Sequence, residues 1–147
     1  MQHAESIMIS RPQAAVWALV GNPQSWGDWV PGVTDVRLEG GGAPSVGAAL
    51  SYTWRGTRRD TTVTAFEDEG MIGIAGSEKN YEFSETIRVR EAFRGTAVTI
   101  TMGFEPTVWW ASLLAIFMLP LKGLLLGRPL RKELQALRAA VEAKPAG

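Results

Sequence analysis

Residues 11–33 read RPQAAVWALVGNPQSWGDWVPGV, and this stretch decides the fold. Its first part carries apolar side chains at helical spacing, and Gly21 follows as a natural helix end. Asn22 and Pro23 then start a second short helix, because proline is favoured in the first helical turn. Ser10 stands three residues before Gln13, which is the spacing of a capping box. We therefore expect two small helices directly after a first strand.

The rest of the chain up to residue 104 is expected to form an antiparallel sheet. Apolar and polar residues alternate there, and glycine-rich turns separate short runs, which is typical of strands with one buried face. The first strand is expected over residues 4–10, before the two helices. The six later strands are expected over residues 33–39, 48–55, 58–67, 71–77, 81–91 and 95–104.

The C-terminal region predicts one long helix over residues 107–143. Its second half repeats Leu130, Leu134, Leu137 and Val141 at helical spacing. A straight helix of that length would span about 54 Å, which exceeds a domain of this size, so bends are expected near Pro120 and residues 127–129. The elements together predict an α+β fold and a single domain over residues 1–147, in which a seven-stranded curved antiparallel sheet wraps around the long C-terminal helix.

Composition narrows the possible functions. The chain has 147 residues, with 15 basic and 15 acidic side chains, no cysteine and one histidine. The absence of cysteine excludes thiol catalysis and cysteine-ligated metals, and His3 alone cannot build a multi-histidine site, so we expect no metal and no cofactor. A balanced charge argues against nucleic-acid binding. The N-terminus lacks a secretory pattern, so a cytoplasmic location is expected.

The chain resembles the START-like, helix-grip superfamily, in particular its polyketide cyclase/dehydrase and lipid-transport group, SRPBCC. The resemblance rests on residues 11–33, on the strands that follow, and on a last helix carrying RKELQALRAAVE at residues 131–142. It extends over residues 5–142. The resemblance implies a cavity under the long helix that binds hydrophobic or aromatic small molecules. It specifies the fold more closely than the activity, because one fold hosts binders, carriers and enzymes.

Glu85 is the sharpest candidate for chemistry. It alternates in step with Phe83 and Ile87, so its carboxyl group is expected on the concave face of the sheet, with a raised pKa suited to acid or base catalysis. The alternative is a structural ion pair with Arg59, which points to the same side. The Tyr52 hydroxyl could bind a carbonyl group or simply complete the packing. The candidate catalytic residues are Glu85, Arg59 and Tyr52.

Large apolar side chains are expected to form the wall of the cavity. Trp54 shares the inward face with Tyr52, and Trp26 and Trp29 flank the second short helix. Aromatic walls suit a planar ligand, although tryptophan also fills ordinary cores. The predicted ligand-binding residues are Trp26, Trp29, Tyr52, Trp54, Val63, Tyr81, Phe83, Glu85, Met102, Leu114, Phe117 and Met118.

Residues 108–126, VWWASLLAIFMLPLKGLLL, form the most apolar segment. Apolar side chains surround the whole helix there, whereas a surface helix is polar on its outer side. The length permits a membrane span, but Pro120, Lys122 and Gly123 oppose it. Three explanations stay open: a homodimer contact through residues 109–126, a peripheral contact with an anionic membrane, and burial within the chain itself.

These observations leave three functions. The first is binding or transport of a lipid-like or polyketide-like hydrophobic molecule in the cavity. The second is a polyketide aromatase/cyclase or dehydratase without metal or cofactor. The third is a membrane-associated lipid or quinone carrier. Inward apolar residues outnumber inward polar ones, and such a composition favours binding over positioned proton transfer.

Overall fold

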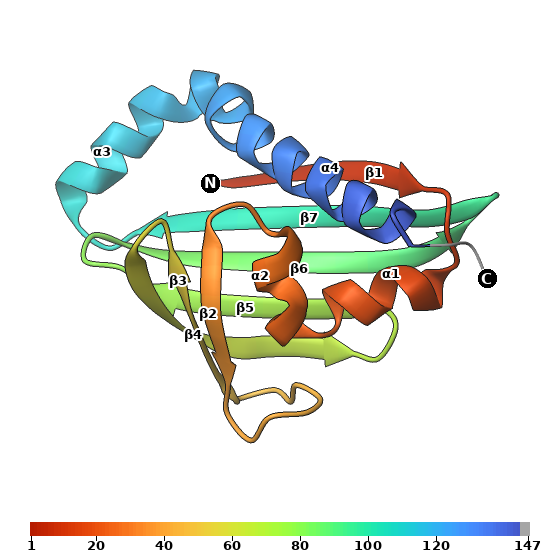
Figure 1. The fold of residues 1–147 in the computed structure, drawn as a ribbon. Coiled ribbons are helices and arrows are strands. Elements are labelled where there is room, and N and C mark those ends of the chain that lie inside the picture. Colours follow the sequence, from red (N-terminus) through yellow and green to blue (C-terminus); the bar gives the residue numbers. More distant parts are fainter. Residues whose placement is uncertain (145–147) are drawn as a thin grey trace.

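The computed structural model describes residues 1–144, and the chain runs from a first strand through two small helices, six further strands and a bent helical segment (Figure 1). Strand β1 spans Gln2–Ile9, and helices α1 (Gln13–Val20) and α2 (Trp26–Trp29) follow, with the 3-10 turn η1 (Pro23–Ser25) between them. The next strands are β2 (Val33–Leu38), β3 (Ala49–Trp54), β4 (Thr57–Glu67), β5 (Met71–Ser77), β6 (Tyr81–Ala92) and β7 (Gly95–Pro106). The C-terminal segment contains α3 (Trp109–Met118), the 3-10 turn η2 (Leu119–Leu121), the π-helical turn η3 (Gly123–Gly127) and α4 (Arg128–Glu142).

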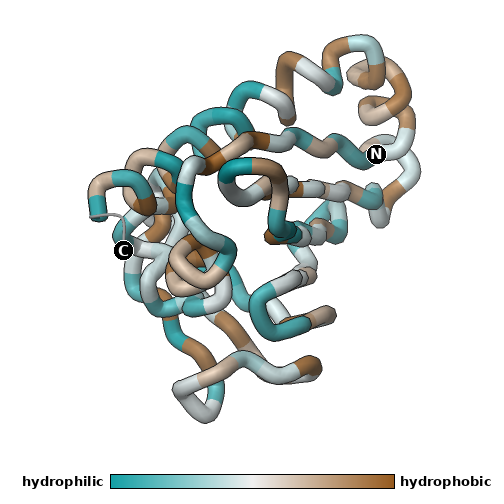
Figure 2. Tube along the Cα trace, turned by 90° about the vertical axis from the view of Figure 1, so that its right-hand side faces the viewer, coloured by the Kyte–Doolittle hydropathy of each residue, from teal (hydrophilic) through white to brown (hydrophobic). Residues whose placement is uncertain are grey.

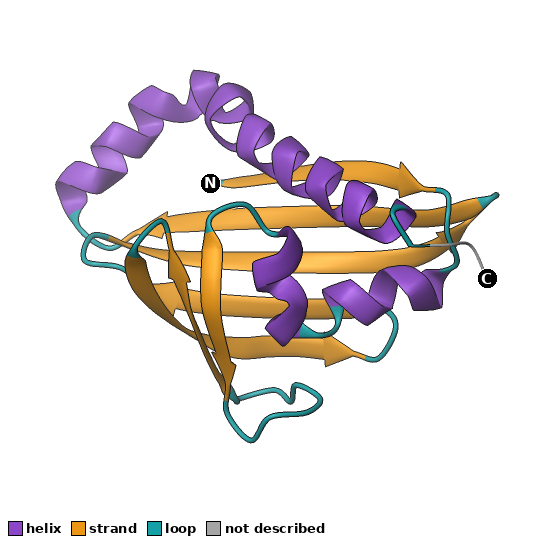
Figure 3. Cartoon of the chain, in the orientation of Figure 1, coloured by secondary structure: helices purple, strands orange, loops and turns teal. Residues whose placement is uncertain are grey.

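The seven strands form one antiparallel sheet in the order β1-β7-β6-β5-β4-β3-β2. The predicted α+β architecture with a seven-stranded sheet is confirmed. Figure 3 shows the helices on one side of the sheet, with α4 running along it and α1 and α2 at one end. Pairing fixes which side chains face the helices: Ile74 of β5 pairs with Glu85 of β6, which pairs with Met102 of β7. Directly paired residues point to the same face, so these three side chains form one inward row.

The entry to α1 differs from the prediction. The residue that caps this helix is Pro12, and no side chain makes a capping hydrogen bond there. The predicted cap at Ser10 is wrong, because its segment instead joins the far end of α4. The Ser10 backbone N–H donates to the Glu142 carboxylate at 3.2 Å, and the Arg11 guanidinium donates to the Glu142 carbonyl at 3.0 Å. The connection between β1 and α1 therefore holds the C-terminal end of α4 in place.

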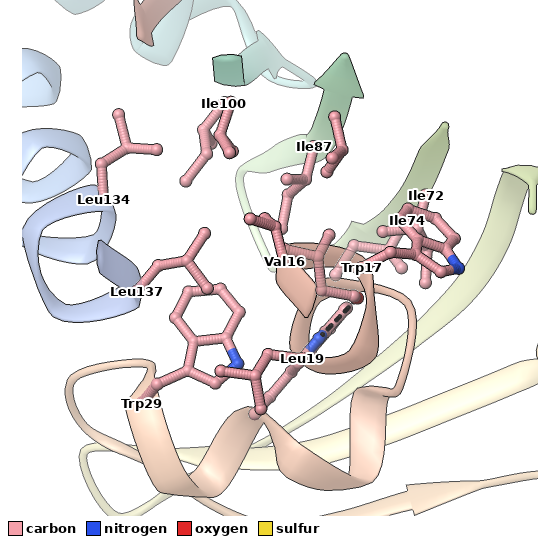
Figure 4. Packing of buried hydrophobic residues seen from close by; sticks show 14 of the residues in the cluster. Val16, Trp17, Leu19, Trp29, Ile72, Ile74, Ile87, Ile100, Leu134 and Leu137 are labelled. Atoms are coloured by element: carbon pink, nitrogen blue, oxygen red, sulfur yellow. Dashed lines mark hydrogen bonds between the residues drawn. The ribbon is translucent and has the colours of Figure 1, made fainter. Parts of the chain in front are cut away.

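The hydrophobic core lies between the concave face of the sheet and helices α1, α2 and α4. Leu134 and Leu137 of α4 are directed toward Ile100 of the sheet and Trp29 of α2 (Figure 4). Each fully buried leucine contributes about 1.5–3 kcal/mol relative to an exposed one. The apolar stripe predicted for residues 130–141 is therefore the face that attaches α4 to the sheet.

The C-terminal segment is not one long helix against the sheet. The part Trp109–Leu121 and the part Gly123–Glu142 are bent by 81° at the break between them. Pro120 lacks a backbone N–H and Gly123 has a low helix propensity. The break therefore falls where the sequence supports a helix least. Only α4 lies on the sheet, whereas α3 projects beyond it (Figure 1). No single helix of the described residues is long and apolar enough to cross a membrane. The two parts of the bent pair reach the necessary length and apolar composition only when they are taken together.

The projecting segment exposes its apolar side chains. None of the α3 residues is buried. Of the thirteen large hydrophobic residues that are exposed in residues 1–144, ten lie within residues 109–125. We call residues 109–125 the apolar arm. Figure 2 shows hydrophobic colour gathered along this part of the trace. The sequence expectation that Leu114, Phe117 and Met118 line the cavity assumed a helix that follows the sheet, and the bend removes them from it.

A polar cluster holds α4 against the edge strand β1 at the bend. The ring nitrogen Nε2 of His3 lies 2.8 Å from Oε1 of Glu5, and the Arg131 guanidinium donates to the same oxygen at 2.9 Å. The hydrogen bond with His3 is the largest influence that holds the pKa of Glu5 below its usual value, and Arg131 adds to it. Gly127 lies directly against this cluster, since a Cβ there would meet Arg131 Nη1 and Glu5 Oε1 at 2.9 Å each. A side chain at this position would therefore displace the ends of the Arg131 and Glu5 side chains.

Candidate functional site

A cavity of about 390 Å³ lies between the inner face of the sheet and the start of α4. Its volume is within the range of small-molecule sites. Most of the wall is apolar or aromatic, and the acidic, basic and phenolic groups come from β3, β4, the turn between these two strands, β6 and α4. The lining residues are Trp26, Val30, Pro31, Val33, Tyr52, Trp54, Arg55, Arg59, Ile74, Tyr81, Glu85, Ile87, Met102, Phe104, Leu125, Leu126, Pro129, Leu130, Lys132 and Glu133.

Two carboxyl groups meet inside this cavity. Glu85 comes from the middle of β6 and Glu133 from α4, and they are hydrogen-bonded to each other. Burial raises the pKa of both groups. The charge of Glu85 and the hydrogen bond raise the pKa of Glu133 further, whereas the same hydrogen bond and Arg59 oppose the rise at Glu85. The pair therefore shares a proton, which Glu133 holds more readily than Glu85.

Arg59 lies on β4 beside this pair and contacts both an acidic residue and two aromatic rings. Its Nε lies 3.5 Å from the Glu78 carboxylate, and these two residues form an ion pair. Its guanidinium also lies over the rings of Trp54, at 4.6 Å, and Phe83, at 5.0 Å. Its charge attracts Glu85 without a direct ion pair. Arg59 Nε is buried and makes no hydrogen bond within residues 1–144, which leaves a donor unsatisfied.

Tyr52 completes the polar group of the cavity. It pairs with Arg59 across β3 and β4, so both side chains point inward. Burial raises the pKa of Tyr52 to about 12, and the charge of Glu85 adds to the rise while Arg59 opposes it. The phenol therefore keeps its proton throughout the physiological range and acts as a hydrogen-bond donor.

Several predicted residues do line the cavity, and others lie elsewhere. Trp26, Tyr52, Trp54, Tyr81, Glu85 and Met102 line it, as does Arg59. Trp29 and Val63 are instead buried in the hydrophobic core, and Figure 4 shows Trp29 turned toward Leu137. Phe83 is buried against Gly76 of the neighbouring strand, where a Cβ would come within 2.7 Å of its ring.

Phe83 also borders a second, open depression of about 820 Å³. The strands line this depression with polar and small side chains, among them Asp60, Glu82 and Ser84. Glu82 and Ser84 alternate with Glu85 along β6, so they lie on the outer face of the sheet. The two hollows are therefore on opposite faces, and the carboxyl pair belongs to the inner one.

Glu133 is a candidate site residue that the sequence analysis missed. It stands three residues after Leu130 and four before Leu137, which places it on the buried stripe of α4. A charged residue inside an apolar stripe is the signal that could have found it, because buried acids need a specific environment. Lys132 and Arg55 at the cavity rim were also missed.

The titratable groups that line the cavity are the carboxyls of Glu85 and Glu133, the phenols of Tyr52 and Tyr81, the guanidinium groups of Arg55 and Arg59, and the Lys132 ammonium group. Within residues 1–144, no three His, Cys, Asp or Glu side chains are grouped so that they could hold a metal ion. The arrangement offers a proton donor and a proton acceptor in contact, a neutral phenol donor and a cation beside them. Such a set can bind an oxygen-bearing ligand or move a proton.

Residues 2–142 match the sequence profile of a family described as polyketide cyclase/dehydrase and lipid transport. A comparison with curated proteins finds no match.

Solved structures share the fold over the whole chain. A START superfamily protein from Mycobacterium smegmatis superposes with a TM-score of 0.73 at 14% identity, with 97% of each chain covered. Norcoclaurine synthase from Thalictrum flavum, solved with dopamine and hydroxybenzaldehyde, gives 0.68 at 13% identity, covering 100% of this chain and 89% of the enzyme. XoxI from Bacillus cereus gives 0.67 at 20% identity, with 96% and 95% covered. These likenesses confirm the predicted START-like helix-grip fold.

Proposed function

Because the chain belongs to the polyketide cyclase/dehydrase and lipid transport family, we propose that it binds a hydrophobic small molecule, lipid-like or polyketide-like, in the cavity between the sheet and α4. The observation that carries this proposal is a cavity of about 390 Å³ with apolar walls and one polar cluster. Apolar walls supply affinity, and a few fixed polar groups orient the ligand.

The polar cluster suggests the chemistry of the ligand. Burial raises the pKa of both Glu133 and Tyr52, which favours their protonated forms, and each protonated group can donate a hydrogen bond to an oxygen atom. The guanidinium carbons of Arg55 and Arg59 lie over the Trp54 ring, at 4.8 and 4.6 Å from its centre. The cations fix this indole as a flat wall. The ligand that fits has a hydrophobic or aromatic body and a carbonyl or hydroxyl oxygen at one end.

A cavity-filling variant tests the binding proposal. Met102→Trp places a large ring in the inward row beside Glu85, whereas Met8→Trp adds the same ring at an exposed position of β1. The probe is the neutral dye N-phenyl-1-naphthylamine, whose fluorescence reports an apolar site. We expect Met102→Trp to weaken its affinity at least about tenfold, since the added ring takes the space that the dye would fill. Met8→Trp should bind it like the unmodified protein. Equal affinity of both variants for the dye would show that the cavity is not the binding site.

A second candidate function, dehydration or cyclisation of a polyketide without a cofactor, is favoured by the carboxyl pair. In a dehydration, the Glu85 carboxylate takes a proton from the carbon next to a ketone or thioester carbonyl. The electron pair forms a carbon–carbon double bond as the bond to the β-hydroxyl oxygen breaks. Glu133 gives its proton to that oxygen, which leaves as water, while Tyr52 holds the carbonyl oxygen. The proton on Glu85 then returns to Glu133 through their hydrogen bond.

Isosteric amides separate this second function from simple binding. Glu85→Gln and Glu133→Gln should each lower the turnover of an aromatic 3-hydroxyacyl thioester at least about 100-fold, because each removes one half of the proton transfer. Both variants should still bind the neutral dye. Glu82→Gln, on the outer face of the same strand, is the matched control. Dye binding without turnover in the unmodified protein would leave binding as the function.

A further inference from the structure

The apolar arm is the largest exposed apolar feature of the described chain, and the cavity does not use most of it. The side chain of Trp109 is 76% exposed and that of Phe117 is 80% exposed. Both belong to α3, in which no residue is buried. Soluble monomers rarely leave so many neighbouring large apolar side chains in water, so a surface of this kind marks a contact.

Charge around the arm indicates the chemistry of its partner. Residues 106–132 contain no aspartate or glutamate, but they contain Lys122, Arg128, Arg131 and Lys132. The cations lie at the end of the arm and at the start of α4, next to the exposed apolar side chains. Aromatic and aliphatic side chains beside lysine and arginine are the combination that binds the interface of an anionic bilayer.

We infer that the apolar arm docks on the surface of an anionic lipid bilayer. Trp109 and Phe117 would enter the interface, while Lys122 and Arg128 contact the headgroups. α4 stays on the sheet, because Leu130, Leu134 and Leu137 are buried there. The 81° bend lets the arm leave the sheet without disturbing α4. The contact is therefore peripheral and involves the arm and the first residue of α4.

A second copy of the chain fits the arm less well. The usual twofold contact joins the same patch on both copies. A twofold contact centred near Lys122 and Arg128 would bring these cations of one copy toward those of the other, with no acidic residue in residues 106–132 to neutralise them. Lipid phosphates supply the missing negative charge. Charge complementarity thus favours the bilayer over self-association.

The arm also borders the entrance of the cavity. Leu125 is exposed and belongs both to the arm and to the cavity lining, and Lys132 and Arg55 line the same cavity. A docked arm would bring this edge of the cavity to the lipid surface. If the cavity binds a hydrophobic molecule, as proposed above, that molecule would pass between bilayer and cavity without crossing water. This last step rests on the proposed function, whereas docking does not.

Flotation with vesicles that contain no added ligand tests docking by itself. The unmodified protein should float with vesicles of phosphatidylcholine and phosphatidylglycerol, and bind vesicles of phosphatidylcholine alone more weakly. Replacing Lys122 and Arg128 by glutamine should lower binding to the anionic vesicles about fivefold for each charge removed. Trp109→Ser combined with Phe117→Ser should lower binding to both kinds of vesicle at least about tenfold.

Phe93→Ser is the matched control, because Phe93 is 85% exposed beside Arg94 in another part of the molecule. This variant should float like the unmodified protein. A protein that stays in the aqueous fraction with both kinds of vesicle overturns the proposal. A stable dimer that the Trp109→Ser and Phe117→Ser changes convert to monomer also overturns it, since a second copy would then cover the arm. Loss of dye binding in Met102→Trp reports on the cavity and leaves the flotation result unaffected.

Discussion

Helices α3 and α4 follow each other in the chain, yet only α4 is buried. α3 is the more apolar of the two in composition, WWASLLAIFM against RPLRKELQALRAAVE. Its apolar side chains surround the helix, so no single face is suited to the sheet. α4 gathers Leu130, Leu134, Leu137 and Val141 on one face and keeps its arginines and lysine on the others. The period of the apolar residues, rather than their number, decides which helix the sheet covers.

The largest expected effect comes from the buried stripe of α4. Leu134 is 1% exposed, and Leu134→Ala should lower the free energy of unfolding by about 2–5 kcal/mol, because it leaves a cavity in the core. Urea denaturation followed by far-UV circular dichroism measures this. A loss below about 1 kcal/mol would mean that α4 is not held by this stripe.

The pH dependence of stability tests the acid within that stripe. The pKa of Glu133 is raised in the fold, so above the pKa of an unfolded glutamate the native protein holds a proton that the unfolded chain has lost. The free energy of unfolding should therefore fall as pH rises from about 4.5, by about 1.4 kcal/mol for each unit of elevation.

Glu133→Gln should flatten this decline, so that the variant gains stability relative to the unmodified protein as pH rises. Glu82→Gln on the outer face should leave the slope unchanged. Denaturation curves at several pH values between 4.5 and 8 provide the test. Parallel slopes for Glu133→Gln and the unmodified protein would contradict a shared proton at Glu133.

The two glycines that bound η3 should respond in opposite directions. An alanine Cβ at position 127 would press on Arg131 and Glu5, so Gly127→Ala should cost about 1 kcal/mol. Nothing lies within 4 Å of the corresponding Cβ at Gly123, so Gly123→Ala should gain up to about 1 kcal/mol through helix propensity. Thermal unfolding of the two variants side by side measures the difference, and equal shifts would argue against a close approach at Gly127.

The smallest effect is expected in the arm. Phe117→Ala removes a ring that is exposed and packs on no core, so the free energy of unfolding should change by less than about 0.5 kcal/mol. Urea denaturation next to Leu134→Ala makes the contrast between the two helices direct. A loss comparable to that of Leu134→Ala would show that the arm packs on the body in solution.

Most of the sheet could be predicted because alternation is a local property. Strand β5 has the predicted bounds, and β6 extends one residue beyond them. The same alternation predicts the inward side of Tyr52, Trp54 and Glu85, which line the cavity. The bend of the C-terminal segment was indicated by Pro120, but its direction depends on packing between distant elements. Leu114 and Phe117 were assigned to the cavity for that reason.

The partner of Glu85 could not be read from alternation. Arg59 was the neighbour expected from the sheet, but its direct ion pair is with Glu78. Glu133 belongs to another element, and only the packing of α4 brings the two acids together. Val63 and Phe83 face inward as predicted, but the core covers Val63, and Phe83 fills the space above Gly76. A strand residue must thus point inward to line the cavity, but pointing inward is not sufficient.

The distribution of the tryptophans has a spectroscopic consequence. Trp17 and Trp29 lie in the core, Trp26 and Trp54 line the cavity, and the remaining two lie on the arm. Intrinsic fluorescence is therefore the sum of three populations: shielded indoles that emit at short wavelength, cavity indoles that a bound chromophore would quench by energy transfer, and hydrated indoles that acrylamide reaches first. One emission spectrum of the native chain thus carries separate signals from the core, the cavity and the arm.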